Sequence, residues 1–238
     1  MTPGKAPFPH AMARLAVLAA LCLGALPPAA ARAAPEAQQE TGSTRSLYML
    51  LIQQARSDGR PRAALAYLAD FDRQYPGDLD ARILRVNCLL DLGQVDQARA
   101  ALAAIPAGSR NGKASLVRGH VRAAEGDWEA AIGDYAAALR ADPADPLTGN
   151  ALGYAQLRTG RAALAVETLK AALDLAPGNA VIRNNLLLAL TMAGRADEAE
   201  ASLRAIRDAG ARARLRGQIA EQSERLAAAR GGSVAQEP

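Results

Sequence analysis

Few side chains of this 238-residue sequence could carry out nucleophilic or metal chemistry, and they lie far apart along the chain. The sequence holds two histidines and two cysteines, and beyond residue 33 only His120 and Cys88 remain. A catalytic nucleophile needs a base within hydrogen-bond reach, and a structural zinc site needs four ligands. His120 and Cys88 supply neither set. The sequence therefore predicts no catalytic residue, no metal site and no cofactor, and we expect Cys88 to be a buried, inert thiol.

The net charge of +4 gives no argument for nucleic acid as a partner. Lys5, Arg14 and Arg32 stand among the first 33 residues, and without them 25 basic and 24 acidic residues remain. Binding to a phosphate backbone needs a concentrated basic face. The densest run of arginines, over residues 204–216, is interrupted by Asp208 and is typical of a solvated helix surface.

Residues 1–33 have the pattern of a secretory signal peptide. A basic front precedes an unbroken apolar run over residues 15–26, and Ala-Arg-Ala at 31–33 fits the small-x-small rule for cleavage before Ala34. Twelve apolar residues are fewer than the roughly 20 that a membrane-spanning helix needs, although an uncleaved anchor is an alternative. The signal predicts an exported protein, in the periplasm or at the periplasmic face of the outer membrane.

Cys22 offers another alternative, a lipid-modified N-terminus. A lipoprotein signal needs a small residue before the modified cysteine, and Leu21 is bulky. We therefore favour simple cleavage. The polar, weakly patterned residues 34–44 that follow are expected to form a flexible lead-in.

Three residue types recur together every 33 or 34 positions. The glycines are Gly59, Gly93, Gly126, Gly160 and Gly194, the alanines are Ala64, Ala98, Ala131, Ala165 and Ala199, and the large residues are Leu68, Leu102, Tyr135, Leu169 and Leu203. Each glycine suits a turn between two helices, because a positive φ costs it little. Each alanine suits a place where the paired helices approach closely. The low aromatic content, 3%, also favours packed helices over a β-sandwich.

This repeating helix-turn-helix unit resembles the tetratricopeptide repeat. The resemblance is best over the third and fourth units, and it implies a non-enzymatic, protein-binding, all-α protein: a right-handed α-solenoid of about five units and a C-terminal capping helix. The expected segments are the units 45–78, 79–111, 112–145, 146–179 and 180–213, the capping helix 214–230 and a disordered tail 231–238.

The first helix of each unit is expected to line the concave side of such a solenoid. The polar and aromatic residues predicted to face this groove are Gln53, Asn87, His120, Asn150, Tyr154, Arg158, Asn184 and Asn185. Asparagine amides both donate to and accept from a peptide backbone, and tyrosine adds a flat apolar contact. We interpret the groove as a protein-binding surface. An alternative for the adjacent asparagines is that they start or cap a helix after residue 179.

Two segments carry a narrower resemblance. Residues 150–161 and 181–200 resemble repeats of TadD-type proteins, which belong to the tight-adherence machinery that assembles Flp pili. The resemblance implies an accessory factor that binds an outer-membrane secretin or another pilus-assembly component. It would reach the membrane only through that partner or through a lipid on Cys22. The alternative is a scaffold for another envelope process, such as cell-wall enzyme regulation, cytochrome maturation or polysaccharide export.

Overall fold

The computed structural model describes the backbone of residues 30–109 and 111–234 and the side chains of residues 43–109 and 111–229. The chain divides into two units, residues 1–44 and 45–238. Of the first unit the structure describes the start of α1 (Ala30–Ser57), so most of the expected signal peptide lies outside the described residues. None of the described helices is long and apolar enough to cross a membrane.

Residues 34–44, expected as a flexible lead-in, instead belong to α1. The run Glu-Ala-Gln-Gln-Glu at 36–40 consists of good helix formers, which explains why the helix begins before the first repeat.

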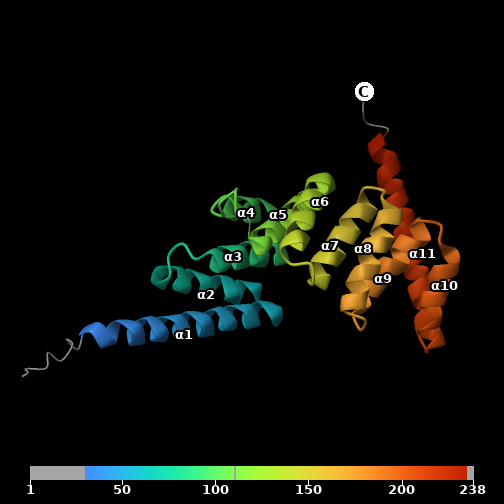
Figure 1. Cartoon of the computed structure of the whole chain (residues 1–238). Helices are drawn as coiled ribbons and strands as arrows, with labels where there is room; N and C mark the ends of the chain where they lie inside the picture. The colour runs from blue at the N-terminus through green and yellow to red at the C-terminus, as the bar shows by residue number, and fades with distance from the viewer. Residues whose placement is uncertain (1–29, 110, 235–238) are drawn as a thin grey trace, which may run out of the picture. The chain divides into compact units, whose positions relative to one another are not determined.

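The described part of the second unit contains ten more helices, which follow one another in packed pairs (Figure 1). They are α2 (Pro61–Gln74), α3 (Leu79–Asp91), α4 (Val95–Leu102), α5 (Gly112–Glu125), α6 (Trp128–Ala141), α7 (Pro146–Arg158), α8 (Ala162–Leu175), α9 (Ala180–Met192), α10 (Ala196–Arg204) and α11 (Ala209–Val234). First helices pack on the preceding pair: α3 contacts α2, α5 contacts α3 and α4, and α9 contacts α7 and α8. The predicted all-α solenoid of helix pairs is confirmed.

The turns within the pairs use the glycines that recur in the sequence. All five have positive φ, from 70° at Gly93 to 87° at Gly126. At Gly126 the left-handed conformation ends α5 and turns the chain into α6, where a residue with a side chain would be strained. The recurring alanines are buried: four are 0% exposed and Ala199 is 8% exposed. Both parts of the repeat therefore have the structural roles that their spacing predicts.

Two further glycines allow the helices of a pair to touch. A Cβ atom on Gly119 of α5 would lie 2.6 Å from Cε1 of Tyr135, and one on Gly153 of α7 would lie 2.5 Å from Cγ of Leu169. Both large residues are buried in the helix that follows. The small residue and the large residue thus form an interlock within the third pair and within the fourth pair.

The core consists of clusters that join neighbouring pairs. Ile52, Leu68 and Phe71 are fully buried where α1, α2 and α3 meet, and Cys88 lies in the same cluster. Burial raises the pKa of the Cys88 thiol above its usual value, because the thiolate would lose its solvation. The largest cluster runs from α7 to α11. Stability is therefore spread over contacts between neighbours, as in other repeat arrays.

The capping helix is longer than predicted. α11 begins at Ala209 and not at 214, because the side chain of Asp208 accepts a hydrogen bond from the backbone N–H of Ala211 (2.6 Å). The last residues of the expected fifth unit therefore belong to α11. At the other end α11 continues to Val234, so the start of the expected disordered tail is helical, and residues 235–238 lie outside the described part of the chain.

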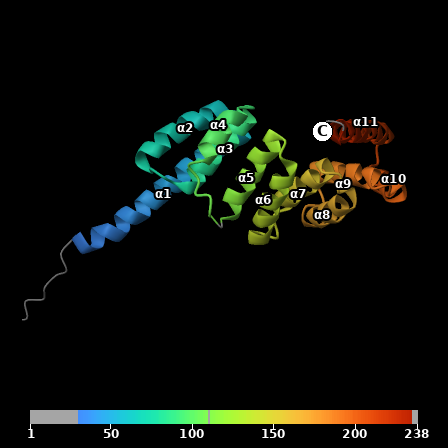
Figure 2. The same cartoon turned by 90° about the horizontal axis from the view of Figure 1, so that it is seen from above.

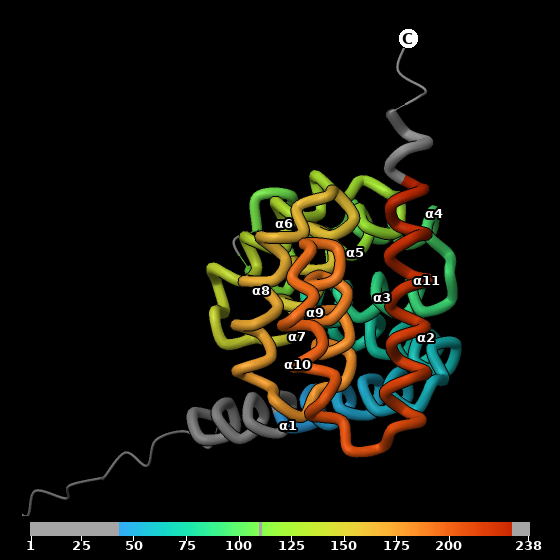
Figure 3. The backbone as a smooth tube through the Cα atoms, turned by 90° about the vertical axis from the view of Figure 1, so that its right-hand side faces the viewer, coloured from blue at the N-terminus to red at the C-terminus, as the bar shows by residue number. Residues whose placement is uncertain are grey.

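The capping helix packs mainly against the first helix of the last pair. Ile219 and Leu226 of α11 are buried in the cluster that contains Leu188 of α9. The side chain of Arg216 binds both carboxylate oxygens of Glu200 on α10, at 2.9 and 3.0 Å. α11 lies beside α9, on the side away from α8 (Figures 2 and 3). This position brings α11 to the surface that the first helices form.

Candidate protein-binding groove

A hollow of about 400 Å³ opens on the surface formed by the first helices. Its walls come from α5, α6, α7, α9 and α11. The residues that line it are Ala123, Trp128, Tyr135, Asn150, Ala151, Tyr154, Asn185 and Gln222. We call this site the amide–aromatic hollow, because three carboxamides and three aromatic rings meet there and the lining holds no charged side chain.

Three residues predicted for the groove lie together in this hollow. Asn185 of α9 donates a hydrogen bond from Nδ2 to Oδ1 of Asn150 on α7, at 2.8 Å. Tyr154 follows Asn150 by one helical turn, on the same face of α7. The bond holds two neighbouring units in register, and a carboxamide pair has further donors and acceptors with which to bind a ligand.

An aromatic wall stands beside the amide pair. Trp128, the first residue of α6, meets Tyr154 edge to face, with ring centroids 5.9 Å apart. The guanidinium carbon of Arg158 lies 4.2 Å from the centroid of the Trp128 ring, in a cation–π contact. The predicted groove residue Arg158 therefore orients the tryptophan and does not line the hollow itself.

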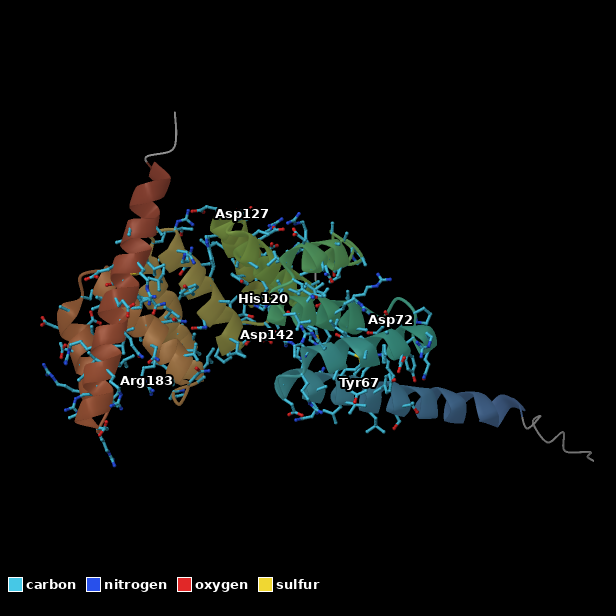
Figure 4. The ribbon with its side chains drawn as sticks, turned by 180° about the vertical axis from the view of Figure 1, so that it is seen from behind. Tyr67, Asp72, His120, Asp127, Asp142 and Arg183 are labelled. Atoms are coloured by element: carbon cyan, nitrogen blue, oxygen red, sulfur yellow. The ribbon has the colours of Figure 1, made fainter. Side chains whose placement is uncertain are left out.

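His120, which is labelled in Figure 4, does not line the hollow but supports it from α5 through Tyr135. It is half-buried, and its ring centroid is 5.6 Å from that of Tyr135, which does line the hollow. Burial lowers the pKa of the imidazole below its ordinary value of 6.5, and the positive charge of Arg56 acts in the same direction, while Asp91 and Asp145 oppose it. The neutral form of His120 is therefore favoured in the folded protein.

The other predicted groove residues are not brought into the hollow. Gln53 is exposed on α1, Asn87 is half-buried on α3, and Asn184 is half-buried on α9 next to Asn185. Adjacent helical residues point in directions about 100° apart, so Asn184 cannot share the position of Asn185. The alternative reading of these two asparagines as caps is wrong, because Asn179 caps α9 by accepting from Val181 and Ile182.

Five of the eight lining residues were missing from the predicted groove: Ala123, Trp128, Tyr135, Ala151 and Gln222. Trp128 is the single tryptophan of the chain and stands beside a glycine turn, and this rare residue type is a signal that could have identified the site. Gln222 could not be found from the repeat register, because it comes from the capping helix.

Two cations of the first helices are already paired with carboxylates. Arg56 is bonded to Asp91 of α3 (Nε–Oδ2, 2.6 Å), and Lys113 lies 3.5 Å from Asp80. Among the described residues there is also no group of three or more His, Cys, Asp or Glu side chains that could hold a metal ion. The arrangement suits recognition of an uncharged polar and apolar surface.

Burial of neutral His120 predicts a pH dependence of stability. Because the unfolded state binds a proton more readily than the folded state, the free energy of unfolding is expected to decrease as the pH falls through 6.5 towards the lower pKa of the folded protein. Urea unfolding of the protein and of His120→Gln at pH 7.5 and pH 5.5 measures this effect. The variant is expected to lose part of the pH dependence, and an identical loss of stability in both proteins would contradict the assignment.

Two family models of known proteins match the chain. One tetratricopeptide repeat family model matches residues 55–116 and 156–222, and a second matches residues 89–146 and 116–180. No curated protein sequence matches the chain.

Similar solved structures contain helical repeats of the same kind. A thermophilic TPR protein of Thermus thermophilus is 25% identical, with 74% of this chain and 97% of that chain covered and a TM-score of 0.60. The pilF protein of Pseudomonas aeruginosa is 17% identical, with 81% and 91% covered and a TM-score of 0.62. A MamA protein is 19% identical, with 68% and 90% covered and a TM-score of 0.53.

Proposed function

Because the chain belongs to the tetratricopeptide repeat family, whose domains bind proteins, we propose that it is a non-enzymatic adaptor that holds a partner protein in the amide–aromatic hollow. The observation that carries the proposal is the meeting of the Asn150–Asn185 amide pair with the Trp128–Tyr154 aromatic wall in one open hollow. Sites of this kind combine apolar burial with a few polar groups that fix orientation.

The chemistry of the hollow defines the segment that it binds. Its three carboxamides, from Asn150, Asn185 and Gln222, can pair with backbone N–H and C=O groups, and its rings can cover an apolar side chain. No lysine or arginine lines the hollow, so a terminal carboxylate would find no cation there. An uncharged internal segment of the partner therefore fits better than its C-terminus.

The pathway that we propose is the assembly of Flp-type pili in the bacterial cell envelope. The two segments that resemble TadD-type proteins, 150–161 and 181–200, include most of α7 and α9 and contain both members of the amide pair. The signal-like pattern of residues 1–33 supports a site of action outside the cytoplasm. The proposed partner is an outer-membrane secretin or another pilus-assembly component.

Co-purification from envelope extracts tests the proposal. The tagged protein is compared with Asn150→Ala/Tyr154→Ala/Asn185→Ala and with a control, Leu164→Ala/Leu175→Ala, which changes two exposed leucines of α8. We expect a secretin or pilus-assembly protein to be captured by the protein and by the control, with at least a tenfold loss in the triple variant. Capture of cell-wall, cytochrome-maturation or polysaccharide-export enzymes would favour the other envelope pathways. Equal capture by all three proteins would reject the hollow as the binding site.

The capping helix allows a finer test of the same site. Gln222→Ala removes the carboxamide that α11 contributes to the hollow, whereas Gln218→Ala removes an exposed carboxamide one turn earlier. Neither side chain is buried, so both variants are expected to fold normally. Only Gln222→Ala is expected to weaken capture of the partner.

A further inference from the structure

The first helix of the array presents an apolar face to solvent. Leu47, Leu50 and Leu51 of α1 are 65%, 59% and 45% exposed, and they lie at i, i+3 and i+4. Leucines at this spacing form one continuous patch on a helix. Repeat arrays usually end in a polar face, and α11 provides such an end after the last pair.

The repeat register shows what kind of surface this patch is. Leu47 holds the third position of its unit, and the residues at the third position of the later units are Ala81, Ala114, Thr148 and Ile182. These four residues are at most 2% exposed. The tenth position repeats the contrast: Gln54 is exposed, whereas its later equivalents are Cys88, Val121, Ala155 and Ala189, which are at most 1% exposed. In the later units this face packs on the preceding helix pair.

Leu47 therefore lies on a stacking face that has no preceding pair among the described residues of the second unit, and Leu50 and Leu51 lie beside it on α1. A helix is the partner that this face is shaped to receive, since a helix covers it in each later unit. Residues 46–54 carry no charged side chain, so the partner's surface should also be uncharged.

A second copy of the chain offers both a helix and an uncharged apolar surface. In a two-fold symmetric interface each patch meets the same patch of the other copy. A charged patch would then face like charges and be repelled, whereas an uncharged patch can pack against itself. Stacking head to tail would require the other end of the array, where the buried Ile219 and Leu226 hold α11 in place. We propose that the protein forms a two-fold symmetric dimer through the face of α1 that contains Leu47, Leu50 and Leu51.

The dimer joins the two arrays through their first units. The amide–aromatic hollow is built by helices from α5 onward, and none of its lining residues belongs to α1. Each copy therefore keeps its own hollow, and the dimer presents two binding sites to a multimeric partner.

Analytical ultracentrifugation of the purified protein tests the dimer. The patch is smaller than a standard interface, so we expect reversible dimerisation with a Kd on the order of 10 μM and follow it from about 1 to 200 μM. Leu47→Glu/Leu51→Glu is expected to raise the Kd at least tenfold. The matched control Leu164→Glu/Leu175→Glu places the same charges on two exposed leucines of α8 and is expected to dimerise normally.

Two results would overturn the proposal: a monomer over the whole concentration range, or a dimer that survives Leu47→Glu/Leu51→Glu. Circular dichroism shows whether each variant is folded, and because both leucines are exposed we expect no loss of helix. The outcome is independent of partner capture, so the dimer and the proposed function can fail separately.

Discussion

Replacing Gly153 by alanine is expected to lower the free energy of unfolding by about 2 kcal/mol, although alanine is the better helix former. The added Cβ atom would lie 2.5 Å from Cγ and 2.8 Å from Cδ2 of Leu169, and Leu169 is fully buried and cannot move aside. The overlap would push α7 and α8 apart at the point where the fourth pair is most closely packed. Urea unfolding followed by circular dichroism measures the change.

The control is the same substitution at Gly133, which is exposed on α6 and has no atom within 4 Å of its Cβ position. There alanine is expected to raise stability by about 0.8 kcal/mol, because only the difference in helix propensity acts. The two substitutions thus have opposite predicted signs. In a Leu169→Ala background the penalty at Gly153 is expected to disappear, since the overlapping atoms are gone. A penalty that persists in that background would contradict the interlock.

Removal of the Asp134 carboxylate is the second change with a large expected effect. Asp134 is 7% exposed; Oδ1 accepts a hydrogen bond from Nε of Arg118 (2.9 Å), and Oδ2 forms an ion pair with Nη1 of Arg122 (2.7 Å). Asp134→Ala leaves both guanidinium groups of α5 without this partner, and the side chain of Arg118 is only 19% exposed. Loss of one member of a buried ion pair costs about 3–5 kcal/mol. Because Arg122 is 40% exposed, we expect a smaller cost, about 2 kcal/mol.

The matched control is Asp70→Ala, which breaks an ion pair between Asp70 and Arg73 (2.6 Å). The side chain of Asp70 is 50% exposed and that of Arg73 is 72% exposed. Water and salt screen such a pair, so its loss is expected to change stability by less than about 0.5 kcal/mol. Comparable losses from Asp134→Ala and Asp70→Ala in the same urea titration would show that the buried pair does not hold α5 to α6.

The regular part of this fold could be predicted from the sequence because each unit repeats the same turn and the same close contact between two helices. A glycine that must adopt positive φ and an alanine that must fit between two helices recur at nearly constant spacing, as at Gly126 and Ala131. The need for positive φ and the need for a small side chain each apply to a single position of the unit, so the residue type at that position reveals the need.

The ends of the array could not be predicted in the same way, because they follow no repeat. The extension of α1 ahead of the first repeat runs through residues 36–40, which are good helix formers, and the start of α11 depends on a capping hydrogen bond from Ala211 to Asp208. Such boundaries are decided by local competition between helix and turn.

The candidate site was predictable in part. The register places Asn150 and Tyr154 on the inner face of α7, but it cannot show that the Asn185 amide reaches across to Asn150. It also cannot show that α11 folds back onto α9 and adds Gln222 to the hollow. Both features depend on how neighbouring helices rotate against each other when their side chains pack.

The most direct test of the central claim is to observe the hollow while a partner binds. Trp128 is the single tryptophan of the chain and stands in the aromatic wall, so incorporation of 5-fluorotryptophan gives one ¹⁹F resonance at the site. Titration with the partner captured from the envelope is expected to shift or broaden this resonance saturably. The shift should be absent in Asn150→Ala/Tyr154→Ala/Asn185→Ala and present in Leu164→Ala/Leu175→Ala. Saturable binding of the partner with an unchanged Trp128 resonance would show that the protein binds its partner elsewhere.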